Sequence, residues 1–127
     1  MTTEAIVHLP GALDVAPAAT ADADGWIALG SMDQVFGARA CHSLRVGNVQ
    51  VGLFLVEGEI YAIDDICSHG NAKLSEGDLD GFEVECPLHA GLFDIRSGKA
   101  LSAPVTRDVR SHGIRRDGEL LFIRMAS

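Results

Sequence analysis

The chain has 127 residues, of which 47% are hydrophobic and 22% are charged, so it can bury the core of one domain and is not disordered as a whole. Eighteen acidic residues against ten basic ones give a formal net charge of -8, which argues against nucleic acid as a partner because phosphates attract the opposite charge. No stretch approaches the roughly 18 to 20 apolar residues that a membrane-spanning helix needs, so we expect a soluble protein with no membrane partner.

The first 25 residues carry few signals of ordered structure. They are rich in Ala, Thr and Asp, contain Pro10 and Pro17, and predict a flexible N-terminal extension over residues 1–25 to which the sequence assigns no role. One short apolar stretch inside it, residues 5–9, is compatible with a strand at a sheet edge. The first 20 residues lack the basic start and continuous apolar run of a secretion signal, and the number of cysteines, three, is odd, so we expect a reduced, cytoplasmic protein.

Short strands separated by turn signals fill residues 26–127, which we expect to form one ordered domain that begins at a core residue, Trp26. The turn pairs Gly47-Asn48 and Glu57-Gly58 each interrupt a run of apolar residues and predict two consecutive hairpins. Four later segments have similar apolar and β-branched character: residues 82–86, 92–95, 105–112 and 120–125. The one helical signal is a weak capping pattern at residues 31–34, so the expected fold class is all-β.

Two short segments carry metal-binding residue types in matched pairs, Cys67-Ser68-His69 and Cys86-Pro87-Leu88-His89. Each pair supplies one thiolate and one imidazole, and each follows a predicted strand. Both loops can therefore project from the same end of a sheet and meet around one metal centre. These residue types suit zinc as well as an iron–sulfur cluster, so the ligands alone do not identify the metal.

The arrangement of the ligands favours iron. A Rieske [2Fe-2S] centre holds one iron by two Cys and the other by two His, and each loop supplies one ligand to each iron. A structural zinc site more often has two close Cys followed by a His pair with three to five residues between them, which fits this spacing poorly, although a mononuclear zinc site stays open. Glycines that let backbone amides approach cluster sulfurs surround the ligands: Gly70, Gly77, Gly81 and Gly91.

The motifs between about Trp26 and Arg124 resemble the Rieske ferredoxins of bacterial aromatic-ring-hydroxylating dioxygenase systems, such as those of naphthalene and biphenyl dioxygenases. The resemblance implies an antiparallel β-sandwich base with a smaller cluster-binding β subdomain, whose loops span about residues 64–104. It implies one Rieske-type [2Fe-2S] cluster, with Cys67 and Cys86 on the inner iron and His69 and His89 on the outer iron near the surface. The segments that carry the resemblance are residues 67–70, 74–77, 85–94, 97–100 and 103–105.

The same resemblance implies an electron carrier with no catalytic residues of its own. A flavin-dependent reductase would supply single electrons, which would leave through the exposed edges of His69 and His89 to a terminal oxygenase. A monomer suits such a mobile carrier. Two alternatives stay open: a small Rieske-type subunit of another redox enzyme such as nitrite reductase, or a zinc-stabilised binding module. Residues expected to surround or cover the cluster are Gly70, Pro87, Gly91, Phe93 and, on a third loop, Pro104.

Some positions depart from the high-potential Rieske proteins of respiratory complexes. Those proteins have an extra Cys in each ligand loop, where this chain has Ala72 and Leu88, so no loop disulfide is possible. They also have a Ser and a Tyr whose hydroxyls donate to the cluster and its cysteine sulfur, where this chain has Gly91 and Phe93. We therefore expect a potential at the low end of the Rieske range of about -150 to +300 mV.

The remaining cysteine and histidines lack partners at ligand spacing, and we assign no role to Cys41, His8, His42 or His112. Acidic residues flank the two ligand loops and are candidates for contacts with a basic partner protein. These candidates are Asp64, Asp65, Glu76, Asp78 and Asp80.

Overall fold

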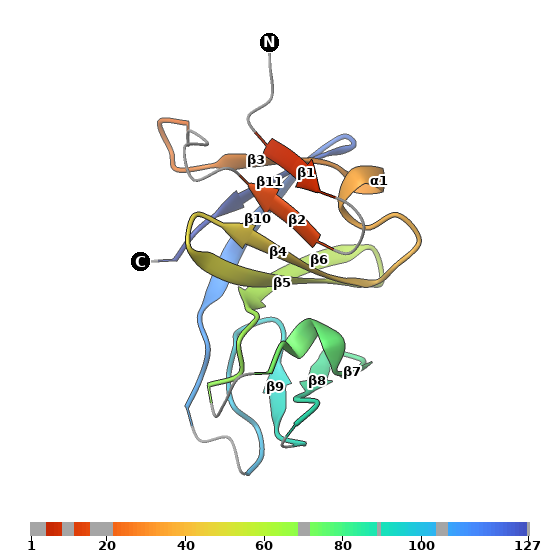
Figure 1. Cartoon of the computed structure of the whole chain (residues 1–127), viewed down its shortest axis with the longest axis vertical. Helices are drawn as coiled ribbons and strands as arrows, with labels where there is room; N and C mark the ends of the chain where they lie inside the picture. Colours follow the sequence, from red (N-terminus) through yellow and green to blue (C-terminus); the bar gives the residue numbers. More distant parts are fainter. Residues whose placement is uncertain are drawn as a thin grey trace.

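The computed structural model describes residues 5–8, 12–15, 22–68, 72–88, 90–103 and 107–126. These residues form an eight-stranded sheet, in the order β1-β2-β4-β5-β6-β10-β11-β3, and a three-stranded sheet, in the order β7-β8-β9. Figure 1 shows the larger sheet as a base and the smaller sheet as a separate unit attached at one end. This agrees with the expected all-β fold of a base and a smaller subdomain.

The strands of the base are short and mostly antiparallel. They are β1 (Ala5–His8), β2 (Ala12–Val15), β3 (Ile27–Ser31), β4 (Cys41–Val46), β5 (Val49–Val56), β6 (Glu59–Asp64), β10 (Ser111–Asp117) and β11 (Leu120–Arg124). The smaller sheet contains β7 (Asp78–Asp80), β8 (Glu83–Glu85) and β9 (Leu92–Asp94). Two helical turns complete the described elements, α1 (Met32–Val35) and the 3-10 turn η1 (Leu74–Glu76).

Both predicted hairpins are confirmed. Strands β4 and β5 pair antiparallel across Gly47-Asn48, and β5 and β6 pair across Glu57-Gly58. Glu57 and Gly58 have φ angles of 53° and 82°, the left-handed conformation that a tight turn between two strands requires. The helical turn α1 also follows the sequence signal, because Ser31 and Gln34 form a reciprocal capping box.

The central strand β5 buries residues on both of its faces and so serves two hydrophobic cores. Val51 and Leu53 belong to the core of the base. Phe54, which points to the opposite face because side chains alternate along a strand, belongs to a second core together with Ile63 of β6. The second core continues into the smaller unit, where its buried members are Cys67, Ala72, Leu74, Val84, Cys86, Phe93, Ile95 and Val109.

The segment predicted as a strand over residues 105–112 is a strand only from Ser111 onward, and residues 104–106 lie outside the described part of the chain. Residues 107–110 cross from the smaller unit to the base and bind each of them by isolated hydrogen bonds. Val109 N–H donates to Gly98 O at 2.8 Å, and Arg110 O accepts from Asp64 N–H at 2.9 Å. A segment that changes sheets cannot keep a continuous ladder with one neighbour.

The assignment of Trp26 to the core is wrong. Its indole is only partly buried, and the guanidinium groups of Arg115 and Arg124 lie 4.9 and 4.7 Å from the ring, as in cation–π pairs. Trp26 stands directly before β3, which is the last strand of the large sheet among the described residues. Arginine side chains take the place of a hydrophobic neighbour.

The N-terminal residues contribute two strands. β1 and β2 pair antiparallel, and β2 adds in parallel to β4 at the edge of the base. The apolar stretch at residues 5–9 is therefore a strand over Ala5–His8. The division of the chain into an extension over residues 1–25 and a domain over residues 26–127 stays a prediction.

Truncation of Phe54 tests the second core. Its side chain is fully buried, so Phe54→Ala should lower the free energy of unfolding by about 3–5 kcal/mol through lost burial and a cavity. Urea denaturation followed by circular dichroism gives this value. Leu120→Ala is the matched control, since Leu120 is 51% exposed and should lose about 0.5 kcal/mol or less. Equal losses in the two variants would contradict the assignment of Phe54 to a core.

Candidate metal centre

Two loops of equal length carry the predicted ligand motifs. Cys67 N–H donates to Ala72 O at 2.9 Å, and Cys86 N–H donates to Gly91 O at 2.8 Å. One residue further out, Ile66 pairs with Lys73, and Glu85 pairs with Leu92. The first loop (residues 67–72) and the second loop (residues 86–91) are thus closed in the same register, each with its cysteine at the first position.

The structure brings the two cysteines into one buried environment. Cys67 is 4% exposed and Cys86 is 1% exposed, and both belong to the second core. Two buried thiols, contributed by two loops that are closed by matching backbone hydrogen bonds, are a suitable donor set for one iron of a [2Fe-2S] cluster. The described residues therefore fit the thiolate half of the predicted ligand set.

The two predicted histidine ligands, His69 and His89, lie outside the described residues, as do Gly70 and Pro104. In the part of the chain that the structure describes, no group of three or more His, Cys, Asp or Glu side chains is placed to hold a metal ion. The described structure thus brings together the two cysteines, and the imidazole half of the ligand set stays a prediction from spacing and resemblance.

Three of the residues expected around the cluster are described. Gly91 is buried and accepts the hydrogen bond that closes the second loop. Phe93 is fully buried and lies between Val84 of β8, its cross-strand partner, and Ala100. Pro87 is exposed, so it stiffens the loop from its outer side. Gly91 is thus hydrogen-bonded to Cys86 and Phe93 shares its core, while their relation to a cluster stays a prediction.

A strap of residues 107–112 holds the first loop from the side. The Ser68 hydroxyl donates to Arg107 O, and the Asp64 and Val109 amides donate to Arg110 O and Gly98 O. The contacts of Arg107 and Arg110 join the segment just before and inside the first loop to residues 39 and 46 positions away, whereas Val109 binds Gly98 of the smaller unit. The sequence gives no local signal for them, because the partners are distant along the chain.

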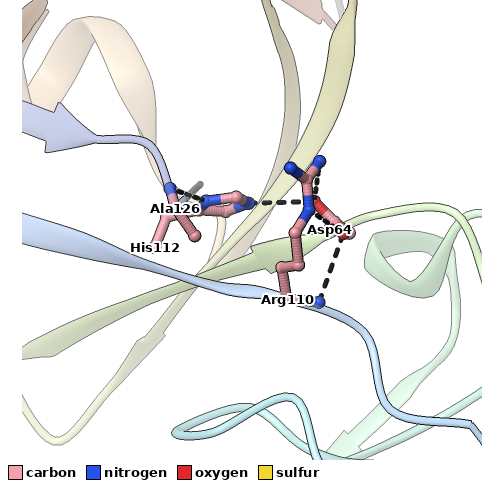
Figure 2. A network of polar contacts seen from close by, with 4 residues as sticks. All are labelled: Asp64, Arg110, His112 and Ala126. Atoms are coloured by element: carbon pink, nitrogen blue, oxygen red, sulfur yellow. Dashed lines mark hydrogen bonds and ion pairs between the residues drawn. The ribbon is translucent and has the colours of Figure 1, made fainter.

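Asp64 is the centre of a polar network between this strap and the end of β6 (Figure 2). Its carboxylate accepts from Arg110 Nε at 2.9 Å, Arg110 Nη2 at 3.2 Å and His112 Nε2 at 2.9 Å. Burial by itself would raise the pKa of Asp64, but these hydrogen bonds, a further one from Arg110 N–H and the nearby positive charge lower it below its ordinary value. The network fixes the chain three residues before Cys67.

His112 takes part in this network as a neutral imidazole. Its Nδ1 accepts a hydrogen bond from Ala126 N–H at 3.0 Å, and a backbone amide can only donate. The ring proton therefore sits on Nε2, which donates to Asp64 (Figure 2). His112 thus connects Asp64 to the backbone of Ala126.

Two other residues without a predicted role are shielded from solvent. Burial raises the pKa of the Cys41 thiol, although the charge of Arg39 opposes this shift. Burial also lowers the pKa of His42, whose Nε2 has no hydrogen-bond partner among the described residues. Burial thus disfavours the charged form of both groups.

Acidic side chains gather on the ribbon of β7 and β8, beside the second loop. In the strand register Asp78 lies opposite Glu85, and Asp80 opposite Glu83, so like charges face each other on one side of the ribbon. A pocket of about 310 Å³ separates this ribbon from the second loop, and Cys86 is part of its lining. The surface next to the candidate metal centre is thus strongly negative.

The five acidic residues predicted to meet a partner divide into three groups. Glu76, Asp78 and Asp80 are exposed, as a docking role requires. The Asp64 carboxylate already accepts hydrogen bonds from Arg110 and His112. The prediction for Asp65 is wrong, since this residue is 0% exposed and binds Ser75 inside the protein. A glycine on the neighbouring strand, Gly52, leaves the space that admits Asp65 to the interior.

Comparisons with known proteins agree with this geometry. A family model described as the Rieske [2Fe-2S] domain matches residues 25–113, which include both cysteine loops. The ferredoxin component of the naphthalene 1,2-dioxygenase system of Pseudomonas aeruginosa is 46% identical over 83 residues, which cover 65% of this chain and 80% of that protein.

Solved structures of ferredoxins show the same fold. The ferredoxin of carbazole 1,9a-dioxygenase from Nocardioides aromaticivorans IC177 has a TM-score of 0.71 and 29% identity, covering 78% of this chain and 96% of that chain. A chain in a complex of reduced oxygenase and oxidized ferredoxin in carbazole 1,9a-dioxygenase has a TM-score of 0.70 and 29% identity, covering 79% of this chain and 93% of that chain.

No helix in the described ranges is long and apolar enough to span a membrane.

The lowered pKa of Asp64 predicts a pH dependence of stability. A carboxyl whose folded-state pKa lies below its unfolded value, about 3.9, stabilises the fold above that value and loses this contribution as pH falls through the folded pKa. Asp64→Asn should therefore reduce the free energy of unfolding at pH 7 and weaken its decline as pH falls below about 5. Urea titrations at each pH measure both effects. Asp117→Asn, at the exposed end of β10, is the control, and an unchanged pH profile in Asp64→Asn would refute the linkage.

Proposed function

The chain belongs to the family of Rieske [2Fe-2S] domains, and on that premise we propose that it is a ferredoxin that carries single electrons to the terminal oxygenase of an aromatic-ring-hydroxylating dioxygenase system. Its cofactor is one Rieske-type [2Fe-2S] cluster. The observation that carries the proposal is a pair of six-residue loops, each closed by a hydrogen bond from the amide of its first residue, which is a buried cysteine. Relatives that are ferredoxin components, rather than catalytic subunits, support the role of an electron carrier that is not itself an enzyme.

We assign Cys67 and Cys86 to the inner iron, and His69 and His89 to the outer iron. The burial of both cysteines and the matched closure of their loops support the first assignment. Motif spacing and family membership support the second, since one imidazole follows each cysteine in its loop. Catalytic residues are not part of this proposal.

The chain contributes a rigid setting for electron transfer. The bound cluster accepts and returns one electron at a time. The loop-closing hydrogen bonds, the Asp64 network and the second core keep both cysteines in place in either redox state, which limits reorganisation. The imidazole edges of His69 and His89 are the proposed route by which electrons leave, and Gly91 and Phe93 offer no hydroxyl that would favour the reduced state.

Two partner proteins complete the proposal. A terminal oxygenase is the acceptor, and the solved complex of a similar ferredoxin with its oxygenase supports it. A flavin-dependent reductase is the proposed donor, and both encounters would take place in the cytoplasm with this chain as a monomer. The acidic ribbon at β7 and β8 would steer the chain toward basic surfaces, an effect on association rate that weakens as salt is added.

Electron paramagnetic resonance after dithionite reduction tests the cofactor and its cysteine ligands. The protein should give a rhombic signal with an average g-value below that of all-cysteine clusters, with two irons and two sulfides per chain. Cys67→Ser and Cys86→Ser should each lose this signal and most of the iron, because each removes a buried ligand. Cys41→Ser is the matched control and should keep both, as this thiol lies outside the proposed ligand set.

The same samples discriminate the other candidate functions. Stoichiometric zinc without an electron paramagnetic resonance signal would indicate a zinc-stabilised binding module and would contradict the ferredoxin proposal. An intact cluster that fails to reduce the oxygenase component of any aromatic dioxygenase would instead favour a small subunit of another redox enzyme, such as nitrite reductase. Loss of the signal in Cys41→Ser would overturn the ligand assignment.

The missing hydroxyls near Cys86 give a prediction about the potential. Gly91→Ser together with Phe93→Tyr should raise the midpoint potential, because new donors to the cluster and to the cysteine sulfur stabilise the more negative reduced state. A donor that favours the reduced state by about 1.4 kcal/mol shifts a one-electron potential by about 59 mV. Redox titration followed by visible circular dichroism measures the shift. A folded double variant with an unchanged or lower midpoint would count against the assignment of these positions.

A further inference from the structure

Asp65 is a buried carboxylate whose hydrogen bonds all lead to one helical turn or to the base. It is 0% exposed. Its Oδ1 accepts from Ser75 N–H at 2.7 Å, its Oδ2 accepts from the Ser75 hydroxyl at 2.7 Å, and its backbone oxygen accepts from Leu74 N–H at 2.7 Å. The Asp65 amide in turn donates to Gln50 O on β5 at 2.9 Å. These four bonds fasten the start of η1 to the base sheet at a point two residues before Cys67.

The base sheet leaves room for this carboxylate at Gly52. A Cβ atom at that position of β5 would lie 2.6 Å from Asp65 Oδ1 and 3.1 Å from the ring of Phe54. Glycine weakens the middle of a strand because it adds no side-chain packing. Its presence in the central strand is explained by the space that Asp65 needs.

The other end of η1 lies against the last residue of β8, directly before the second loop. Gly77, which follows η1, would carry a Cβ only 1.8 Å from the backbone oxygen of Glu85, so any side chain there collides with main chain. Gly77 has a φ of -87°, and its glycine is therefore required by this close approach and not by an unusual backbone angle. Glu85 directly precedes Cys86.

The 3-10 turn η1 therefore spans the distance between the two cysteine loops. Asp65 holds its beginning next to the first loop, and Gly77 sets its end against the entrance of the second. The turn contacts β4 and β5 on one side and β8 on the other, and Figure 1 shows it in green between the larger sheet and the strands of the smaller unit. In the sheets of the described residues, the three-residue strands β7, β8 and β9 pair with one another and not with the base.

We propose that Asp65, Ser75 and Gly77 are positioning residues that set the separation of Cys67 and Cys86. They would thereby determine how slowly the protein releases the iron of its cluster and which g-values the reduced cluster shows. This inference rests on the proposed ferredoxin function. It assigns a role to a buried acid that takes no part in metal binding, and it separates this role from the general stability of the fold.

The test compares variants of the full chain loaded with cluster. Iron and sulfide content, the rate of iron release to a chelator, the g-values of the reduced protein and the free energy of unfolding are measured for Asp65→Ala, Ser75→Ala and Gly77→Ala. Ser31→Ala is the matched control, because it removes a side-chain cap from α1 in the base and leaves η1 unchanged. Asp65→Asn is the conservative variant, since its amide can accept from Ser75 N–H and donate to Ser75 Oγ.

We expect iron release to be about 10-fold faster or more in Asp65→Ala, Ser75→Ala and Gly77→Ala, with shifted g-values, as for the loss of other groups that orient metal ligands. Ser31→Ala should leave release and g-values unchanged even where it loses as much stability as Ser75→Ala, and Asp65→Asn should restore slow release. If Asp65→Ala or Gly77→Ala fails to fold, Ser75→Ala and Asp65→Asn decide.

Two negative results are distinguishable. A parent protein that holds zinc, or no iron and sulfide, overturns the ferredoxin function and this inference with it. A parent protein with an intact cluster, but equal iron release in Ser75→Ala and Ser31→Ala at equal stability loss, overturns the positioning role alone.

Discussion

The arrangement depends on one constraint, which is that the smaller unit shares its hydrophobic core with the base. Its three strands have three residues each, too few to bury an independent core. Phe54 and Ile63 of the base complete the second core, so this core is continuous from the base into the smaller unit. Both cysteines lie in that shared core, and the position of the candidate metal centre is therefore fixed by the base as much as by its own loops.

The parts of the fold that could be predicted are those with local causes. The turn pairs Gly47-Asn48 and Glu57-Gly58 permit the backbone angles of tight turns, and the cap at Ser31 and Gln34 satisfies amides within one helical turn. The spacing of the cysteines within their motifs is local in the same sense. Each of these signals is contained in fewer than ten neighbouring residues, so no knowledge of the distant chain is needed.

The parts that could not be predicted depend on partners far along the chain. Asp64 and Asp65 are chemically identical neighbours, yet one binds Arg110 and His112, 46 and 48 residues away, and the other is buried against Ser75. The start of β10 at Ser111 depends on pairing with β6, and the exposure of Trp26 depends on its place beside the last strand of the sheet. The histidine half of the ligand set still rests on the motif and the family.

The hydrogen bond from Ala126 to His112 has a consequence for the end of the chain. Through the imidazole and Asp64, it connects the last described residue to the backbone three positions before Cys67 in a relay of donors and acceptors. A chain cut after Arg124 would keep every strand, but the imidazole would lose the donor that selects its tautomer. Ala126 therefore helps to hold the segment before the first cysteine loop, and its removal would weaken that support.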